Sequence, residues 1–223
     1  MAAVKLPAEQ RFVLYNVDWD TYVTISDKLG ERNIRLNYDG VNLEFMSTSL
    51  EHERAKKLLA RLLETVTEEM DIDILGAGSM TCRRQDLDRG FEPDESYWIA
   101  HEAQMRGRVD IDLMRDPPPD LMLEVEISRS FVDRLALAAR LGVPEVWRWD
   151  REALRVMLLN PDGQYSESEC SRALPFLPVA ELVRFLNPEP AQSETKRLRD
   201  FRDWVRQQMA GGWGGGTATG AHG

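Results

Sequence analysis

The clearest strand pattern in the chain is "PDLMLEVEIS", residues 119–128. Every second residue is apolar, and these residues share one face of a strand: Leu121, Leu123, Val125 and Ile127. The opposite face carries Asp120, Met122, Glu124 and Glu126. Carboxylates in so apolar a segment are costly to bury unless something compensates their charge. Glu124 and Glu126 are therefore the first candidate site residues.

Helical periodicity is strongest after Ser47 and Ser49, either of which is expected to cap the helix. Apolar residues then recur at intervals of three and four: Ala55, Leu58, Leu59, Leu62, Leu63 and Val66. A shorter helix is predicted over 17–30, with Asp18 or Asp20 as N-cap and Gly30 at its end. The segment 193–209 predicts a third helix, with an apolar face that packs on the domain or on a second subunit. Contact with a DNA backbone or a membrane surface is the alternative.

The remaining apolar segments predict a sheet. Residues 33–46 form a hairpin in which Asp39-Gly40 is the tight two-residue turn. Further strands are predicted at 71–75, 79–84, 91–102, 145–149 and 153–159. A helix lies between the strand 119–128 and the strand 145–149, with Ser128 or Ser130 as its cap and Gly142 at its end. Strand, helix and strand over this length predict a βαβ crossover.

Composition fits one ordinary domain. The chain has 223 residues, 43% of them hydrophobic and 30% charged. We expect a domain over 1–190, an amphipathic helix over 191–209 and a disordered Gly-rich tail over 210–223. No segment is apolar enough for a membrane span or a secretory signal. Two cysteines suit reduced thiols in a cytoplasmic protein. The net charge of −10 argues against a protein that binds nucleic acid through its overall charge. A local basic cleft is compatible with this net charge.

A third carboxylate, Asp94, opens the predicted strand 91–102. If that strand is a neighbour of 119–128, Asp94, Glu124 and Glu126 converge at one end of a sheet. Clustered carboxylates repel unless they share a cation, and an all-oxygen cluster selects Mg²⁺ or Mn²⁺. The alternative is that Asp94 caps a turn, and that both glutamates face solvent on a one-sided sheet.

Three segments together carry a family resemblance: "FEPDESYWI", "PPPDLMLEVEISRS" and "VDRLALAARLGVPEVWRWD". They resemble the Uma-type endonuclease family of the PD-(D/E)XK superfamily, over about residues 18 to 186. The resemblance implies a restriction-endonuclease-like α/β fold, with a central mixed sheet flanked by helices. It also implies that Asp94 and Glu124 bind the metal ion. Glu126 stands where the motif has its lysine, and Arg134 stands where the family carries a displaced lysine on the following helix. Arginine can clamp a phosphate but stays protonated.

The resemblance points to further candidates. Glu51, beside His52 at the start of the long helix, matches a position where an acid assists the metal; alternatively, it only favours the helix dipole. Arg83 and Arg84 are candidates for phosphate contact, against the alternative of a solvated hairpin.

The predicted function is Mg²⁺- or Mn²⁺-dependent hydrolysis of phosphodiester bonds in DNA by a homodimer. Asp94, Glu124, Glu126 and Arg134 form the predicted catalytic set, and Asp94, Glu124 and Glu51 the predicted metal ligands. The competing interpretation is a catalytically inactive binding or assembly protein with a nuclease fold. The missing lysine, Arg134 and the acidic pI support this second interpretation.

Overall fold

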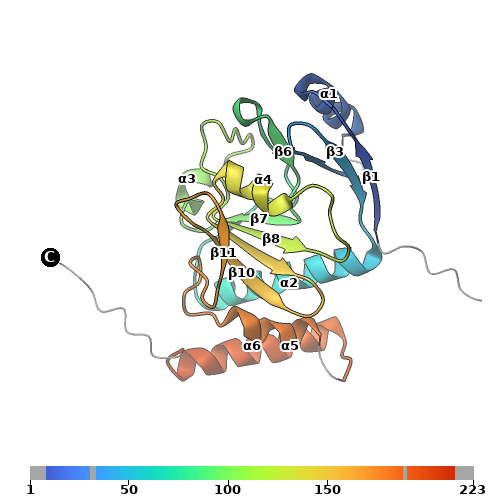
Figure 1. Ribbon diagram of the computed structural model, residues 1–223. Coiled ribbons are helices and arrows are strands. Elements are labelled where there is room, and N and C mark those ends of the chain that lie inside the picture. Colours follow the sequence, from blue (N-terminus) through green and yellow to red (C-terminus); the bar gives the residue numbers. More distant parts are fainter. Residues whose placement is uncertain (1–8, 31–33, 188–189, 214–223) are drawn as a thin grey trace, which may run out of the picture.

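The computed structural model describes residues 9–30, 34–187 and 190–213. Two sheets in this part of the chain pack with helices into a mixed α/β molecule (Figure 1). The predicted α/β class is therefore confirmed. Within the same residues, no helix combines the length and apolarity needed to cross a membrane. Most of the predicted Gly-rich tail, residues 214–223, lies outside the described residues.

The first sheet comes mainly from the N-terminal part of the chain and has the order β1-β3-β2-β6-β5. Its strands are β1 (Gln10–Leu14), β2 (Arg35–Tyr38), β3 (Leu43–Ser47), β5 (Cys82–Arg84) and β6 (Arg89–Phe91). The predicted β2–β3 hairpin is confirmed, but its turn lies one residue later than expected. The Asp39 amide donates to the Asn42 carbonyl at 3.2 Å, and the Asp39 carboxylate accepts from the Val41 amide at 3.0 Å. Asp39 thus flanks the turn and stabilises it through its side chain.

Helix α1 (Trp19–Leu29) covers this sheet, and its capping follows the sequence signal. The Asp18 carboxylate accepts from the Thr21 amide at 2.8 Å. Tyr22 is fully buried and stacks on Tyr38, with ring centroids 4.7 Å apart. Gly90 on β6 makes room for Tyr22, because a Cβ at that position would lie 2.2 Å from the Tyr22 hydroxyl. A residue with a side chain at position 90 would therefore push α1 away from the sheet.

The second sheet has the order β11-β10-β9-β8-β7-β4. Its strands are β4 (Leu75–Gly76), β7 (Glu95–Trp98), β8 (Leu121–Val125), β9 (Glu145–Trp149), β10 (Leu154–Leu159) and β11 (Tyr165–Ser168). Strands β8 and β9 are parallel and are joined through α4 (Arg134–Leu141), so the predicted βαβ crossover is confirmed. Strands β7 and β8 are antiparallel neighbours, with Glu95 opposite Leu123.

Strand β8 is buried on both faces. Leu121, Leu123 and Val125 belong to the core formed with α2 (Leu50–Glu69), whereas Met122 packs in the core formed with α4. Figure 1 shows α2 below this sheet and α4 on its other side. The expectation of a one-sided sheet with Glu124 facing solvent is therefore wrong. Glu124 is only 8% exposed, because α4 and the first sheet cover its face.

Helix α4 begins later than predicted. Its N-cap is Asp133, whose carboxylate accepts from the Ala136 amide at 3.0 Å. The predicted caps Ser128 and Ser130 are wrong, because both hydroxyls donate to buried carboxylates: Ser130 to Glu44 at 2.5 Å, and Ser128 to Glu9. Gly142 ends the helix in the left-handed region at φ +79°, as predicted.

The C-terminal helix α6 (Glu194–Ala210) packs against α2 below the second sheet (Figure 1). Phe201 is fully buried in the same core as the α2 leucines. Packing on the domain is thus the arrangement seen for this helix. The remaining short helices connect the larger elements: 3₁₀ turns Gln85–Leu87 (η1) and Val179–Leu182 (η2), and helices Glu102–Met105 (α3) and Val183–Leu186 (α5).

Candidate functional site

Asp94 lies directly before β7 and is completely buried. One carboxylate oxygen accepts from the Val125 amide at 2.6 Å, at the end of β8. The other oxygen accepts from Arg35 of β2 and lies 3.0 Å from Nε2 of His52 on α2. Asp94 therefore connects both sheets and the long helix through one carboxylate.

Cations surround Asp94 and keep it charged. Burial alone would raise the pKa of this carboxyl, but the nearby Arg134, His52 and Arg35 outweigh burial and hold the pKa below its usual range. Burial would likewise lower the pKa of His52, yet its hydrogen bonds to Asp94 and Glu9 raise it to about 9. His52 is thus an imidazolium between two carboxylates, and its Nδ1 lies 2.6 Å from Glu9.

Glu124 is the second acid of the site and projects from β8 towards α4. One carboxylate oxygen lies 2.5 Å from the guanidinium of Arg134, the first residue of α4. The other oxygen, Oε1, is buried and has no hydrogen-bond partner among the described residues. Burial, with the nearby Asp94 adding to it, raises the pKa of Glu124 to about 7, although Arg134 opposes the shift. Glu124 is therefore poised to exchange a proton near neutral pH.

Arg134 connects the two acids. Its Nη2 lies 2.5 Å from Glu124 and 3.8 Å from Asp94, and it also donates to the Glu92 carbonyl at 3.0 Å. Adjacent strands thus bring Asp94 and Glu124 to one place, as expected. A salt-bridging arginine lies between them, however, where the sequence predicted a shared metal ion. Arg134 keeps its charge, because the two carboxylates raise its pKa despite the burial.

The predicted residue Glu126 lies beyond the end of β8 and forms an ion pair with Arg148 of β9. It does not contact Asp94, but it lines the same cavity as Glu124 and Arg134. This cavity has a volume of ≈ 320 Å³, and Arg11, Arg129 and Phe131 also line it. We call it the β8 cavity.

The other predicted residues lie elsewhere. Glu51 forms a two-point ion pair with Arg151 at 2.6 and 2.8 Å and lines a different cavity. Arg83 pairs with Asp27 at 2.9 Å, and Arg84 pairs with Asp86 at 2.6 Å. None of these three residues contacts Asp94 or Glu124 in the described part of the chain.

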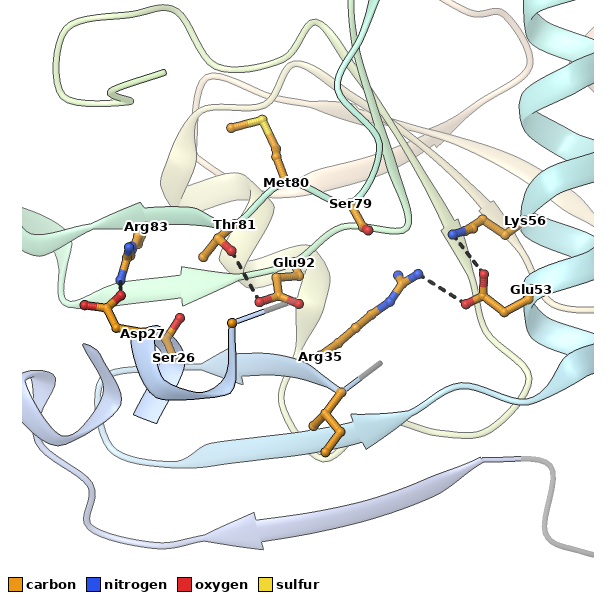
Figure 2. Close-up of a pocket in the computed structure, with 12 residues that line it drawn as sticks. Ser26, Asp27, Arg35, Glu53, Lys56, Ser79, Met80, Thr81, Arg83 and Glu92 are labelled. Carbon is orange, nitrogen blue, oxygen red and sulfur yellow. Dashed lines mark hydrogen bonds and ion pairs between the residues drawn. The ribbon is translucent and has the colours of Figure 1, made fainter. Parts of the chain in front are cut away.

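A larger polar cavity, of ≈ 780 Å³, lies on the other side of Arg35. Figure 2 shows Arg35 and Lys56 both directed at Glu53, at 3.4 and 2.9 Å. The view also shows Thr81 beside Glu92 and Arg83 beside Asp27, so the wall carries paired charges of both signs. Arg35 separates this cavity from Asp94, because its guanidinium contacts Asp94 as well as Glu53.

Several residues that shape the site were not among those predicted from the sequence. Arg35 and Glu44 lie in the hairpin strands β2 and β3, and Glu9 precedes β1. All three are at least 90% buried and partner other charged or polar groups of the site. Charged residues in apolar strands were the available signal for Arg35 and Glu44, and it is the same signal that identified Glu124.

A comparison with protein families assigns the chain. The family model "Uma2: Putative restriction endonuclease" matches residues 19–187, well over half of the 223 residues. The chain belongs to the Uma2 family. The matched residues include Asp94, Glu124 and Arg134, so the whole site lies inside the Uma2 region. The family and the restriction-endonuclease-like fold expected from the sequence are thereby confirmed.

Other comparisons add little to the Uma2 assignment. The chain is similar to a solved structure described as "a putative nuclease belonging to DUF820 from Anabaena variabilis ATCC 29413". The two chains are 15% identical, the match covers 85% of this chain and 99% of that one, and the TM-score is 0.48. No curated protein sequence matches the chain.

Because the sequence predicts Mg²⁺ or Mn²⁺ at this site, the site of this Uma2 chain can be tested for its fit to such an ion. Such ions take several oxygen ligands. Here both oxygens of Asp94 already accept hydrogen bonds, and Arg134 holds one oxygen of Glu124. Within residues 9–30, 34–187 and 190–213, no three metal-binding side chains are grouped around one point. The donor set does not fit a divalent ion in this arrangement, because an arginine already compensates the carboxylates.

Proposed function

We propose that the protein is a nuclease that hydrolyses phosphodiester bonds of DNA in the β8 cavity. The observation that carries the proposal is the state of Glu124: a buried carboxyl with a pKa of about 7, and with one oxygen unpartnered among the described residues, in the wall of a cavity. A general base is most effective when its pKa lies near the working pH. Membership of the Uma2 family supports the reaction class.

The chemistry follows from the residues of the cavity. In its charged form Glu124 accepts a proton from a water molecule, whose oxygen forms a bond to phosphorus. The bond between phosphorus and the leaving oxygen then breaks, and solvent supplies the proton for that oxygen. Arg134 and Arg148 line the cavity and offset the negative charge that develops on the phosphate oxygens. Asp94 keeps Arg134 in place at 3.8 Å.

Participation of Mg²⁺ or Mn²⁺ stays a prediction, and it requires Arg134 to leave Glu124. The homodimer and the cytoplasmic location stay predictions as well. Sedimentation of the purified full-length protein measures the first of these two directly.

The test is cleavage of plasmid and of single-stranded DNA with EDTA, Mg²⁺ or Mn²⁺. Glu124→Gln removes the base and is expected to lower the rate by about 100-fold or more. Glu169→Gln, a change of an exposed glutamate, is the matched control and is expected to leave the rate unchanged. The wild-type rate should rise as the pH increases through about 7, because Glu124 must lose its proton to act as a base. Equal cleavage by the two variants would remove Glu124 from the mechanism.

A second candidate function is supported by Arg134. An arginine held between both acids is also the arrangement expected of a nuclease fold that binds nucleic acid without cutting it. This version predicts that DNA binds with the same affinity to the wild type and to Glu124→Gln, and that neither protein cleaves it under any of the three conditions.

A further inference from the structure

An exposed aromatic pair stands at the rim of the β8 cavity. Phe131 lines the cavity and is 55% exposed, and Tyr15 beside it is 62% exposed. Their rings meet edge to face, with centroids 5.6 Å apart. Single large apolar side chains are common on protein surfaces. Two that contact each other at the mouth of a charged cavity indicate a binding site.

Hydrogen bonds to a buried carboxylate fix the backbone of the loop that carries Phe131. The Phe131 amide donates to one oxygen of Glu44 at 2.8 Å, and the Ser130 hydroxyl donates to the other at 2.5 Å. Glu44 itself is fully buried and also contacts Arg11 at 3.1 Å. A buried carboxylate therefore fixes the backbone at the position where the aromatic ring leaves the surface. Such fixing lowers the entropy cost of binding a ligand to the ring.

Four arginines and three acids line the cavity side of the aromatic pair: Arg11, Arg129, Arg134 and Arg148, with Glu124, Glu126 and Asp133. Arg129 is exposed, and within the described part of the chain it forms no ion pair or side-chain hydrogen bond. Arg148 and Arg134 line the same cavity, each paired with one glutamate. The chain as a whole has a net charge of −10, whereas the arginines that line this cavity outnumber its acids by one, and Arg129, unpaired among the described residues, is free to meet an anionic group. Charge complementarity selects an anionic partner rather than an apolar protein surface.

A partner that presents both negative charge and flat aromatic faces is a nucleic-acid strand whose bases are unpaired. Bases in a duplex are stacked on each other and cannot cover a protein ring, whereas bases of a single strand can. The cavity volume of ≈ 320 Å³ lies at the lower end of ligand pockets, which span roughly 300–1,000 Å³, and so suits a small group rather than a duplex.

We propose that Phe131, supported by Tyr15, is a stacking platform for a base of single-stranded DNA, with Arg129 and Arg148 contacting its phosphates. The platform leads the strand to Glu124, so the inference rests on the proposed nuclease function and specifies its substrate as an unpaired strand. The aromatic pair selects the strand by the faces of its bases and carries no sequence preference.

The test is binding of a fluorescently labelled oligothymidylate to the full-length protein in EDTA, followed by anisotropy. Phe131→Ala is expected to weaken binding by about 5- to 100-fold, and Phe131→Trp is expected to retain it. Phe12→Ala is the matched control. Phe12 is 62% exposed and, like Phe131, lies beside another aromatic ring, since its ring centroid is 6.2 Å from that of Phe45. It points to the opposite face of β1 from Arg11, which lines the cavity. This control is expected to bind like the wild type.

Two further probes separate bases from phosphates. A duplex of the same sequence should bind more weakly than the single strand, and an abasic strand should bind equally to the wild type and to Phe131→Ala. The inference is overturned if Phe131→Ala binds the oligothymidylate like the wild type, or if the duplex binds as tightly as the single strand. A change of oligomeric state in Phe131→Ala, measured by light scattering, would also overturn it, because the aromatic pair would then be a contact between protein chains.

The test of the stacking platform can fail or succeed independently of the test of the proposed nuclease function. Binding in EDTA requires no hydrolysis, so dependence on Phe131 can hold even if Glu124→Gln cleaves DNA normally; only the catalytic proposal then fails. Conversely, cleavage that depends on Glu124 together with binding that ignores Phe131 rejects the platform alone.

Discussion

Single residues at the centre of this protein are coupled through charge. Asp94 contacts Arg35, His52 and the Val125 amide, and Arg134 holds Glu124. Together these contacts join β2, α2, α4 and the start of β7 to the end of β8. Removing one partner from a buried ion pair leaves the other charge uncompensated, which costs far more than an exposed pair is worth. The site residues are therefore also important for stability.

His52 provides a test of this coupling through pH. Its pKa is raised from 6.5 to about 9 on folding, so its stabilising effect is complete below 6.5 and is lost as the pH rises through about 9. We expect His52→Ala to lower the free energy of unfolding by about 3–5 kcal/mol near pH 6, and by less near pH 9.5. Urea denaturation at several pH values measures the difference.

His101→Ala is the control for this measurement. His101 also contacts an aspartate, Asp120, at 2.6 Å, but its side chain is 46% exposed, and its loss is expected to cost about 1 kcal/mol or less. A cost for His52→Ala that stays constant from pH 6 to pH 9.5 would contradict the charged state assigned to His52.

Arg134 allows the metal question to be tested directly. If its guanidinium takes the place of a cation, Arg134→Ala is expected to bind Mn²⁺ more tightly than the wild type, by about 10-fold or more, because the buried Glu124 then loses its paired cation and Asp94 retains only Arg35 and His52. Isothermal titration with Mn²⁺ measures both proteins, and Arg134→Lys, which keeps a positive charge, should resemble the wild type. Tighter binding by the wild type would instead show that Arg134 moves aside for the ion.

The sequence identified the central acids but not their surroundings. Asp94 and Glu124 could be placed together because alternation within strands and their order along the chain are local signals. The role of Arg134 as a bridge depends on the position of α4, which only the tertiary packing determines. Glu126 illustrates the limit: it shares a strand face with Glu124, and its amide still donates to the Trp149 carbonyl of β9 at 2.7 Å. Its side chain nevertheless pairs with Arg148 instead of joining Asp94, because Arg148 lies on the neighbouring strand.

At the level of elements, the periodic segments were predicted well and the junctions less well. The helix α2 and its apolar stripe, the cap of α1 and the β8–α4–β9 crossover all follow from spacing in the chain. The start of α4 was misplaced because Ser128 and Ser130 resemble caps locally but bind distant carboxylates instead. A competing long-range hydrogen bond cannot be seen in a sequence window.

The C-terminal helix α6 is expected to stabilise the fold. Phe201 is fully buried and packs against Phe185, with ring centroids 5.0 Å apart. Phe201→Ala should lower the free energy of unfolding by about 3–5 kcal/mol, because a cavity remains in the core. Arg199→Ala, on the exposed side of the same helix, is the control and should change it by less than about 0.5 kcal/mol. Similar costs for the two variants in denaturant unfolding would mean that α6 does not belong to the cooperative core.

The whole molecule combines a strongly negative charge with a small set of arginines at the β8 cavity. Long-range attraction to DNA is therefore weak, and the proposed recognition of DNA requires contacts made inside or beside the cavity. The negative net charge distinguishes the protein from basic domains, which bind any polyanion. It also favours a substrate that reaches the cavity through stacking as well as through charge.

The salt dependence of DNA binding measures how many phosphates the protein contacts. With Arg129 and Arg148 as the arginines that reach phosphates, the logarithm of the association constant for single-stranded DNA should fall with the logarithm of salt concentration with a slope no steeper than about −2. Anisotropy titrations between 50 and 300 mM NaCl, roughly the range used for such slopes, measure it. A slope near −6 would require many more phosphate contacts than the cavity offers.

The bridge that Arg134 makes between Asp94 and Glu124 has a consequence for how this site changes during evolution. A lineage that loses the arginine alone leaves the buried Glu124 without its paired cation, and one that loses Glu124 alone leaves Arg134 with only the more distant Asp94. Viable descendants are thus expected to alter these positions together, so that the three residues are inherited as one unit.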